Sequence, residues 1–285
     1  MNQPLDVLAI GAHPDDVEWG CGGLLAGLSA AGRRVGIVVL TRGESGTRGT
    51  VEQRLAEARA GAEALGAVEL RFLDCGDAGL RTGRDEEDAL IHELRCLRPH
   101  TVLAPPRHDR HPDHERAAEL VRASCFYAGL RKRPARGPGG EIVDAEQLPA
   151  HRPSNLLHYM LHEPFDPDVI VDCTASWTTK IAALRCHGSQ FPVANGGSQE
   201  ADAEQRATWI SKRSFWDAIE GRARHYGQRI GAEFAEPFLA GGPTGIDAAQ
   251  FEVLYLERGT GAASEDTTAP GPSSDDLREL ESRAS

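Results

Sequence analysis

Short apolar runs alternate with longer amphipathic stretches over the first hundred residues of the chain. The runs rich in aliphatic and β-branched residues predict strands over residues 5–10, 35–40, 68–73 and 101–104. The stretches between them predict helices over residues 17–31, 50–65 and 85–97. Strands and helices that alternate at this spacing predict an α/β fold, with a mostly parallel, doubly wound sheet and right-handed crossovers.

The later part of the chain shows the same alternation less regularly. It predicts helices over residues 115–130, 176–186 and 203–226, and strands over residues 156–161, 169–171 and 251–257. Arg131–Gly140 is rich in Arg, Pro and Gly and predicts a loop. From Gly259 the chain consists mainly of small residues, Pro and acids, which cannot bury enough apolar surface to offset the entropy of ordering. We therefore expect one domain over residues 1–258 and a disordered acidic tail over residues 259–285.

Length, composition and charge restrict the class of protein and its compartment. A chain of 285 residues with 40% apolar and 26% charged residues is long enough to bury the core of one large α/β domain. No run approaches the roughly 18 apolar residues that a membrane span needs, and the start at Met1 lacks the features of a secretory signal. The net charge of −12 argues against nucleic acid as a partner. The six cysteines form no C-x-x-C pair, so we expect a cytoplasmic protein with reduced thiols and without a membrane partner.

Two polar segments carry residue types that bind metals or transfer protons. The first predicted strand is followed by GAHPDD, and the fourth is followed by PPRHDRHPDH. Either segment alone is typical of a turn, since Pro and Asp initiate turns for conformational reasons. Open α/β sheets bind ligands at the carboxyl ends of their strands, so two such segments at equivalent edges favour a functional site. His13, Asp16 and His114 offer the three ligands of a catalytic zinc site, which leaves Asp15 as an unligated carboxylate beside the metal.

The two segments and the strand and helix order around them resemble the PIG-L/LmbE-like family of zinc-dependent N-deacetylases, which has a Rossmann-like fold. The motifs that carry the resemblance are AHPDDVE at residues 12–18 and HPDH at residues 111–114, which are short singly and quite specific together. Three further stretches resemble more narrowly the bacillithiol-pathway deacetylases that act on N-acetylglucosaminyl malate: TRGE at 41–44, GTV at 49–51 with Arg54, and RCHGSQF at 185–191. The resemblance covers about residues 5–257, so residues 1–258 are expected to form a single LmbE-like deacetylase domain.

The resemblance implies a metal and a role for six residues. It implies one Zn²⁺ per chain, with Fe²⁺ as an alternative divalent ion, and the ligands His13, Asp16 and His114. It also implies Asp15 as general base, His111 as the group that stabilises the oxyanion or protonates the leaving amine, and Asp113 as the carboxylate that orients this histidine. Amide hydrolysis needs an activated water, a polarised carbonyl and a proton donor, and such a set supplies all three. The bacillithiol-type relatives that it resembles suggest a homo-oligomer such as a hexamer.

The same resemblance points to a substrate and leaves alternatives open. A malyl group carries two carboxylates, which suit the planar fork of arginine, so Arg54 and Arg110 are the candidate substrate-binding residues. We expect hydrolysis of the acetamide of a small GlcNAc conjugate, most specifically of N-acetylglucosaminyl malate to glucosaminyl malate and acetate in bacillithiol biosynthesis. The alternatives are a deacetylase of another conjugate of the GlcNAc-inositol type, and a non-catalytic sugar-binding module on the same fold. The presence of both Asp15 and His111 argues against the module, which has no need of them.

Other features are expected to be structural. The stretch GCGG at 20–23 lies inside the first predicted helix and does not match G-x-G-x-x-G, so its glycines are expected to allow close helix packing. Trp19 stands where the resemblance leads us to expect a smaller aliphatic residue, a difference that bears on packing more than on mechanism. The histidines outside the two segments are expected to be packed or solvated, namely His158, His162, His187 and His225.

Overall fold

A seven-stranded sheet forms the centre of the fold, with strands in the order β3-β2-β1-β4-β7-β9-β8. The structure is a computed structural model that describes residues 3–144, 146–191 and 213–242. The strands of this sheet are β1 (Val7–Gly11), β2 (Val35–Val39), β3 (Glu69–Phe72), β4 (Thr101–Ala104), β7 (Asn155–Tyr159), β8 (Val169–Asp172) and β9 (Ala235–Ala240). Strands β1, β2, β3, β4 and β7 pair in parallel, as predicted, whereas β9 is antiparallel to β7 and β8.

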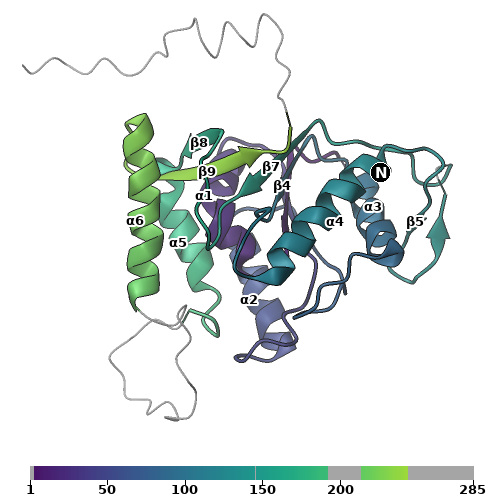
Figure 1. Cartoon of the computed structure of the whole chain (residues 1–285), viewed down its shortest axis with the longest axis horizontal. Coiled ribbons are helices and arrows are strands. Elements are labelled where there is room, and N and C mark those ends of the chain that lie inside the picture. Colours follow the sequence, from purple (N-terminus) through teal and green to yellow (C-terminus); the bar gives the residue numbers. More distant parts are fainter. Residues whose placement is uncertain (1–2, 145, 192–212, 243–285) are drawn as a thin grey trace, which may run out of the picture. The chain divides into compact units, whose positions relative to one another are not determined.

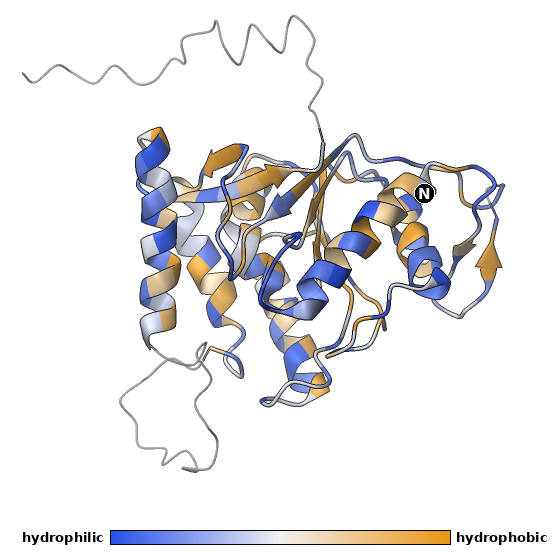
Figure 2. Ribbon diagram, in the orientation of Figure 1, coloured by the Kyte–Doolittle hydropathy of each residue, from blue (hydrophilic) through white to orange (hydrophobic). Residues whose placement is uncertain are grey.

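Helices cover both faces of the sheet (Figure 1). They are α1 (Asp16–Ala30), α2 (Val51–Ala64), α3 (Arg84–Leu97), α4 (Pro112–Ala128), α5 (Trp177–Arg185) and α6 (Arg213–Ile230), with a 3₁₀ turn at Thr174–Ser176. Leu8 and Ile10 of β1 pack with α3 and α4, whereas Val7 and Ala9 pack with the helices of the other face. Successive residues of a strand point to opposite faces, so a strand covered on both faces needs an unbroken apolar run. Figure 2 shows this arrangement as hydrophobic strands between helices whose outer faces are largely hydrophilic.

Strands β1 and β4 are neighbours at the point where the strand order reverses. From β1 the chain moves outward to β2 and β3 on one side, and it then returns to β4 on the other. Connections that leave two adjacent strands in opposite directions open a crevice at the carboxyl ends of those strands. The two polar segments recognised in the sequence follow these two strands, so the fold brings both to the crevice.

Most of the predicted elements are confirmed, and one loop is corrected. Helix α2 lies within the helix predicted over residues 50–65, and Thr50 caps it, because its hydroxyl oxygen accepts a hydrogen bond from the backbone N–H of Gln53 at 3.2 Å. Arg131–Gly140 was predicted to be a loop, but it contains β5 (Ala135–Arg136), which pairs antiparallel with β6 (Ile142–Val143). Strands of two residues are too short to show the alternation on which a sequence pattern depends.

Strand β9 is an element that the sequence pattern did not predict. Pro237 lies inside it, and Pro argues against an interior strand because it has no N–H to donate. The register accommodates this residue, since β7 pairs only with the part of β9 from Phe238 to Ala240. Pro237 therefore lies beyond the paired end of β7.

Some predicted features fall outside the described residues. These are residues 203–212 of a predicted helix, the predicted strand at 251–257 and the predicted tail at 259–285. Among the helices that the structure does describe, none combines the length and the apolar character needed to cross a membrane.

Candidate active site and metal centre

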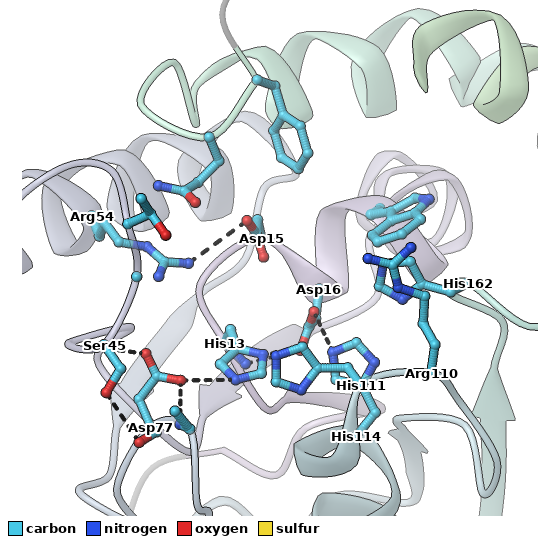
Figure 3. Close-up of a pocket in the computed structure, with 16 residues that line it drawn as sticks. His13, Asp15, Asp16, Ser45, Arg54, Asp77, Arg110, His111, His114 and His162 are labelled. Atoms are coloured by element: carbon cyan, nitrogen blue, oxygen red, sulfur yellow. Dashed lines mark hydrogen bonds and ion pairs between the residues drawn. The ribbon is translucent and has the colours of Figure 1, made fainter. Parts of the chain in front are cut away.

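The turn after β1 holds Asp15 in an unusual backbone conformation. Its φ of 114° and ψ of −24° lie outside the regions that non-glycine residues prefer, and such strain is concentrated at functional sites. Helix α1 begins at Asp16, whose Oδ2 accepts a hydrogen bond from the backbone N–H of His13 at 2.9 Å. The two adjacent carboxylates face different neighbours, Asp15 toward Arg54 and Asp16 toward His114 (Figure 3). The turn thus gives two consecutive acids separate environments.

The segment after β4 leads into α4 through His111. This histidine is the N-cap of α4, and its Nδ1 accepts a hydrogen bond from the backbone N–H of Asp113 at 3.2 Å. Because Nδ1 is the acceptor, the neutral ring carries its proton on Nε2. His114 follows in the first turn of the helix, and the two imidazole rings stack with their centroids 4.8 Å apart.

The three predicted metal ligands lie together. Asp16 Oδ1 is 3.3 Å from His114 Nε2, and Asp16 Oδ2 is 3.6 Å from His13 Nδ1. Each of these residues is at most 7% exposed. His111 joins the group, because ligand atoms of His13, His111 and His114 all lie within 4.8 Å of one another.

The side chains of His13, Asp16 and His114 fit a divalent metal ion. Two imidazoles and a carboxylate are a ligand set that suits zinc and related transition metals. Burial lowers the pKa of His13, but hydrogen bonds to carboxylates outweigh burial and raise the pKa well above its usual value; the partners are Asp113, Asp16 and Asp77. Burial also lowers the pKa of His114, yet the charge of Asp16 and hydrogen bonds to carboxylates raise it to about 9. The surrounding carboxylates thus favour positive charge here, whether protons or a metal ion carry it.

Asp15 lies in a partly buried position beside Arg54. Asp15 Oδ2 is 3.7 Å from Arg54 Nη2. Burial raises the pKa of Asp15 to about 6, although the charge of Arg54 acts in the opposite direction. Arg54 Nη1 donates to the carbonyl oxygen of Gly43 at 3.0 Å, and Nη2 donates to that of Pro14 at 3.1 Å. Arg54, predicted to bind substrate, therefore lies at the site with its guanidinium bonded to the turn that carries Asp15.

The carboxylate of Asp113 has partners other than the predicted one. We expected it to orient His111, but Oδ2 lies 3.4 Å from Nε2 of His13. The same carboxylate accepts hydrogen bonds from the backbone N–H groups of Gly79 at 3.3 Å and Leu80 at 3.0 Å. It is the backbone N–H of Asp113 that contacts His111. The difference arises because the loop after β3, which supplies Gly79 and Leu80, cannot be placed beside α4 from the sequence pattern.

Asp109 is a buried carboxylate that the sequence analysis did not single out. Its Oδ1 lies 3.3 Å from Nδ1 of His114 and 2.8 Å from Nδ1 of His162. It also accepts hydrogen bonds from the backbone N–H groups of His111 at 3.0 Å and His162 at 2.9 Å. Metal-binding histidines commonly donate their second ring N–H to a carboxylate, so the place of Asp109 inside the polar segment was a usable signal.

Asp77 is a polar residue of the site that belongs to no sequence motif, whereas His187 belongs to the RCHGSQF stretch and does not line the cavity. Asp77 Oδ1 lies 3.2 Å from Nε2 of His13, and its Oδ2 accepts a hydrogen bond from the backbone N–H of Ser45 at 2.8 Å. His187 is fully buried, and its Nε2 lies 3.2 Å from Oε1 of Glu18. His187 is therefore packed, as expected, whereas Asp77 adds an acid beside a candidate ligand.

A cavity of about 330 Å³ lies at the carboxyl ends of β1 and β4, and its lining includes His13, Asp15, Asp16, Arg54, Asp77, His111 and His114. A second cavity of about 320 Å³ adjoins it and shares the lining residues Trp19, Arg110 and His162. The ring of Trp19 meets those of His162 and Phe215 edge to face, with centroids 4.6 and 5.2 Å apart. Trp19, expected to matter mainly for packing, is thus also a wall between two cavities, and His162 is a lining residue as well as a packed one.

Comparisons with known proteins agree with the fold and indicate the family. Residues 8–125 match the PIG-L family model, which is described as GlcNAc-PI de-N-acetylase. The crystal structure of a conserved protein from Thermus thermophilus is 34% identical in sequence. It aligns with a TM-score of 0.70 over 86% of this chain and 98% of that protein.

Two curated relatives have names that state a reaction. A diacetylchitobiose deacetylase of Thermococcus kodakarensis is 32% identical over 206 residues, which cover 67% of this chain and 74% of the relative. A 1D-myo-inositol 2-acetamido-2-deoxy-alpha-D-glucopyranoside deacetylase of Nocardiopsis dassonvillei is 28% identical over 71% of this chain and 93% of the relative. Given this similarity, the chain belongs to the PIG-L family and is an N-deacetylase.

Proposed function

We propose that the protein is a zinc-dependent deacetylase that hydrolyses the acetamide of a GlcNAc conjugate. The observation that carries this proposal is that Asp15 and His111 line the same cavity as the candidate ligand cluster, defined as His13, Asp16 and His114. A base and a hydrogen-bond donor for the oxyanion are thereby available at one set of candidate metal ligands. The two named relatives act on substrates that contain an acetamido sugar, which supports the same substrate class here.

The candidate ligand cluster would hold the zinc ion, and Asp15 would act as the base beside it. When bound, zinc lowers the pKa of a coordinated water and polarises an acyl oxygen as a Lewis acid. Asp15 lies outside the ligand set, so its carboxylate is free to accept the proton of the attacking water. With a pKa of about 6, this carboxylate is ionised at neutral pH and more basic than an ordinary aspartate.

His111 is suited to donate a hydrogen bond to the oxygen that gains charge. Burial and the charges of His13 and His114 lower the pKa of His111, so its ring is neutral at neutral pH. Its Nδ1 is engaged by the backbone N–H of Asp113, which leaves the proton on Nε2. That N–H can stabilise the carbonyl oxygen as it gains charge, and the leaving nitrogen can take the proton that Asp15 accepted from the attacking water. Groups in such roles typically contribute about 10²- to 10⁴-fold to the rate.

The second cavity supports a conjugate with an acidic second part. A sugar bound over the candidate ligand cluster would leave the adjoining 320 Å³ for the group attached to it. Arg110 and Arg222 line this cavity together with one acid, Glu163, so the balance of charge there is positive. A malyl group fits this balance, and N-acetylglucosaminyl malate is the substrate that we propose. A GlcNAc-inositol conjugate is the second candidate, favoured by the Nocardiopsis relative.

The test is release of free amine from acetamido sugars by zinc-reconstituted protein. The panel contains GlcNAc-malate, GlcNAc-inositol, diacetylchitobiose and free GlcNAc, with the Asp15→Asn variant as the matched control that keeps the metal ligands. We expect the malate conjugate to react fastest and the control to release little amine from any substrate. Faster reaction of the inositol conjugate would replace the proposed substrate, and no release from any member would overturn the proposed function.

A further inference from the structure

Helix α1 is broken at Cys21, directly behind the turn that carries Asp15 and Asp16. Cys21 has φ −143° and ψ 18°, which are not helical values. In an unbroken helix the N–H of Gly23 would donate to the carbonyl oxygen of Trp19, four residues earlier. The break separates these two groups in the core, where each of them needs another partner.

A buried ion pair supplies these partners. Glu236 accepts hydrogen bonds from the N–H of Gly23 on Oε1 at 2.8 Å and from the N–H of Leu24 on Oε2 at 2.7 Å. Lys180 Nζ donates to the carbonyl oxygen of Trp19 at 2.7 Å and to Oε1 of Glu236 at 2.5 Å. Glu236 thus caps the second part of α1 as if a new helix began there, and Lys180 closes the end of the first part.

The two charged residues are held deep in the fold by elements far away in the sequence. Lys180 and Glu236 are 3% and 2% exposed. They belong to α5 and β9, which lie beyond the residues 8–125 that match the family model. The carboxylate can approach only because residue 23 is glycine: a Cβ there would lie 2.9 Å from Glu236 Oε1 and 2.7 Å from Cβ of Cys173. This meets the expectation that the glycines of this stretch allow close packing.

We propose that Lys180 and Glu236 are positioning residues of the deacetylase site, which hold the break in α1 and thereby fix the turn from Asp15 to Trp19. The proposal rests on the proposed roles of Asp15 and Asp16. Without the ion pair, the simplest way to satisfy the freed backbone groups is the regular helical bond between residues 23 and 19. Closing that bond would straighten α1 and rotate its first turn, moving both carboxylates relative to His114. Displacement by about 1 Å in an active site can cost about 10²-fold in rate.

A purely structural role of the ion pair leads to a different expectation for kcat and zinc affinity. Replacing both members of a buried ion pair by neutral groups of similar volume is often neutral for stability, whereas removing one member leaves an uncompensated charge. The double variant Lys180→Met/Glu236→Met, which removes both charges and the acceptor oxygens, therefore has a better chance of folding than either single variant. If the pair only stabilises the fold, a folded double variant should keep the wild-type kcat and zinc affinity.

The experiment compares this double variant with the wild type in kcat, KM, zinc affinity and Tm. We expect kcat to fall about 10- to 100-fold while KM changes less than about threefold, because the reacting groups are displaced and the rest of the cavity is not. Zinc should bind about tenfold more weakly, because Asp16 moves relative to the histidines. The matched control is Arg133→Met/Asp88→Asn. It removes another ion pair, in which Arg133 Nε lies 2.7 Å from Asp88 Oδ1 and neither residue lines the cavity. The control should leave kcat and zinc affinity unchanged.

Wild-type kcat and zinc affinity in a folded double variant would overturn the proposal. If the double variant does not fold, Glu236→Asp provides the second test, because it keeps the charge but is too short to reach both backbone N–H groups. This variant should show the same loss of kcat, and full activity in it would also overturn the proposal. Zinc titration needs no substrate, so it tests the positioning role even if no GlcNAc conjugate is hydrolysed and the proposed function fails.

Discussion

Oδ1 of Asp109 lies 3.3 Å from Nδ1 of His114, on the side of the imidazole opposite the Nε2 atom that faces Asp16. A carboxylate in this position favours the proton on Nδ1 and so leaves Nε2 as the atom able to bind a metal ion. The same carboxylate contacts His162, which lines both cavities. Asp109 therefore links the orientation of a candidate ligand to the wall of the substrate cavity.

Replacing Asp109 by Asn should weaken zinc binding. The neutral amide no longer favours the required tautomer of His114, and loss of such a partner typically costs about 10- to 100-fold in metal affinity. Competition with a chromogenic chelator would measure the change in the dissociation constant. Asp217→Asn, on an exposed position of α6, is the control and should bind zinc like the wild type. An unchanged zinc affinity in Asp109→Asn would contradict the role given to Asp109.

Variants of neighbouring residues should separate metal binding from catalysis. Asp15 faces Arg54 and not the candidate ligand cluster, so Asp15→Asn should keep zinc but lose at least about 10²-fold in kcat. His13→Ala and His114→Ala should lose both zinc and activity. Elemental analysis of the purified proteins, together with circular dichroism to confirm folding, decides between the two classes. A folded Asp15→Asn protein without zinc would show that Asp15 is a ligand.

The proximity of the residues of the candidate ligand cluster could be predicted from the sequence, because these residues follow two strands that are neighbours in a doubly wound sheet. The apolar run of β1 and the polar turn after it are local patterns, and the adjacency of β1 and β4 follows from the strand order. These three facts suffice to bring His13 and Asp16 to His114. The role of Asp15 as base remains a prediction that the Asp15→Asn variant would test, and the role of His111 at the oxyanion also remains a prediction.

The partners of these residues could not be predicted, because they come from segments whose placement depends on the whole fold. Asp77 and the backbone of Leu80 reach the site through the loop after β3, and no local pattern indicates the direction of that loop. Glu236 lies in β9, next to Pro237, which argues against a strand when the sequence alone is considered. Its contact with Gly23 spans more than two hundred residues of sequence, and only the sheet register determines it.

The pH dependence of kcat/KM should show whether Asp15 is the base, because replacing Arg54 is expected to shift the pKa of Asp15. The positive charge of Arg54 favours the ionised carboxylate and so lowers the pKa of Asp15, against the burial that raises it to about 6. Arg54→Met removes this charge, so the pKa of Asp15 should rise and the acid limb of the profile should move to higher pH. Arg54→Lys keeps a positive charge, and its acid limb should stay closer to that of the wild type. An acid limb that does not move in Arg54→Met would mean that another group controls it.

Arg110 is expected to determine the preference among GlcNAc conjugates, because it lines both the catalytic cavity and the cavity next to it. Losing a hydrogen bond to a charged group costs about 1.5–3 kcal/mol, so Arg110→Gln should lower kcat/KM for the malate conjugate about 10- to 100-fold. Free GlcNAc lacks the second group, so its kcat/KM should change little in Arg110→Gln. The control is Arg122→Gln at an exposed position of α4, which should leave kcat/KM for both substrates unchanged. The ratio of kcat/KM for the two substrates is the measurement, since a general disturbance of the site lowers both values and leaves the ratio unchanged. An unchanged ratio in Arg110→Gln would mean that Arg110 does not bind the second group and that recognition of the conjugate depends on other residues of the second cavity.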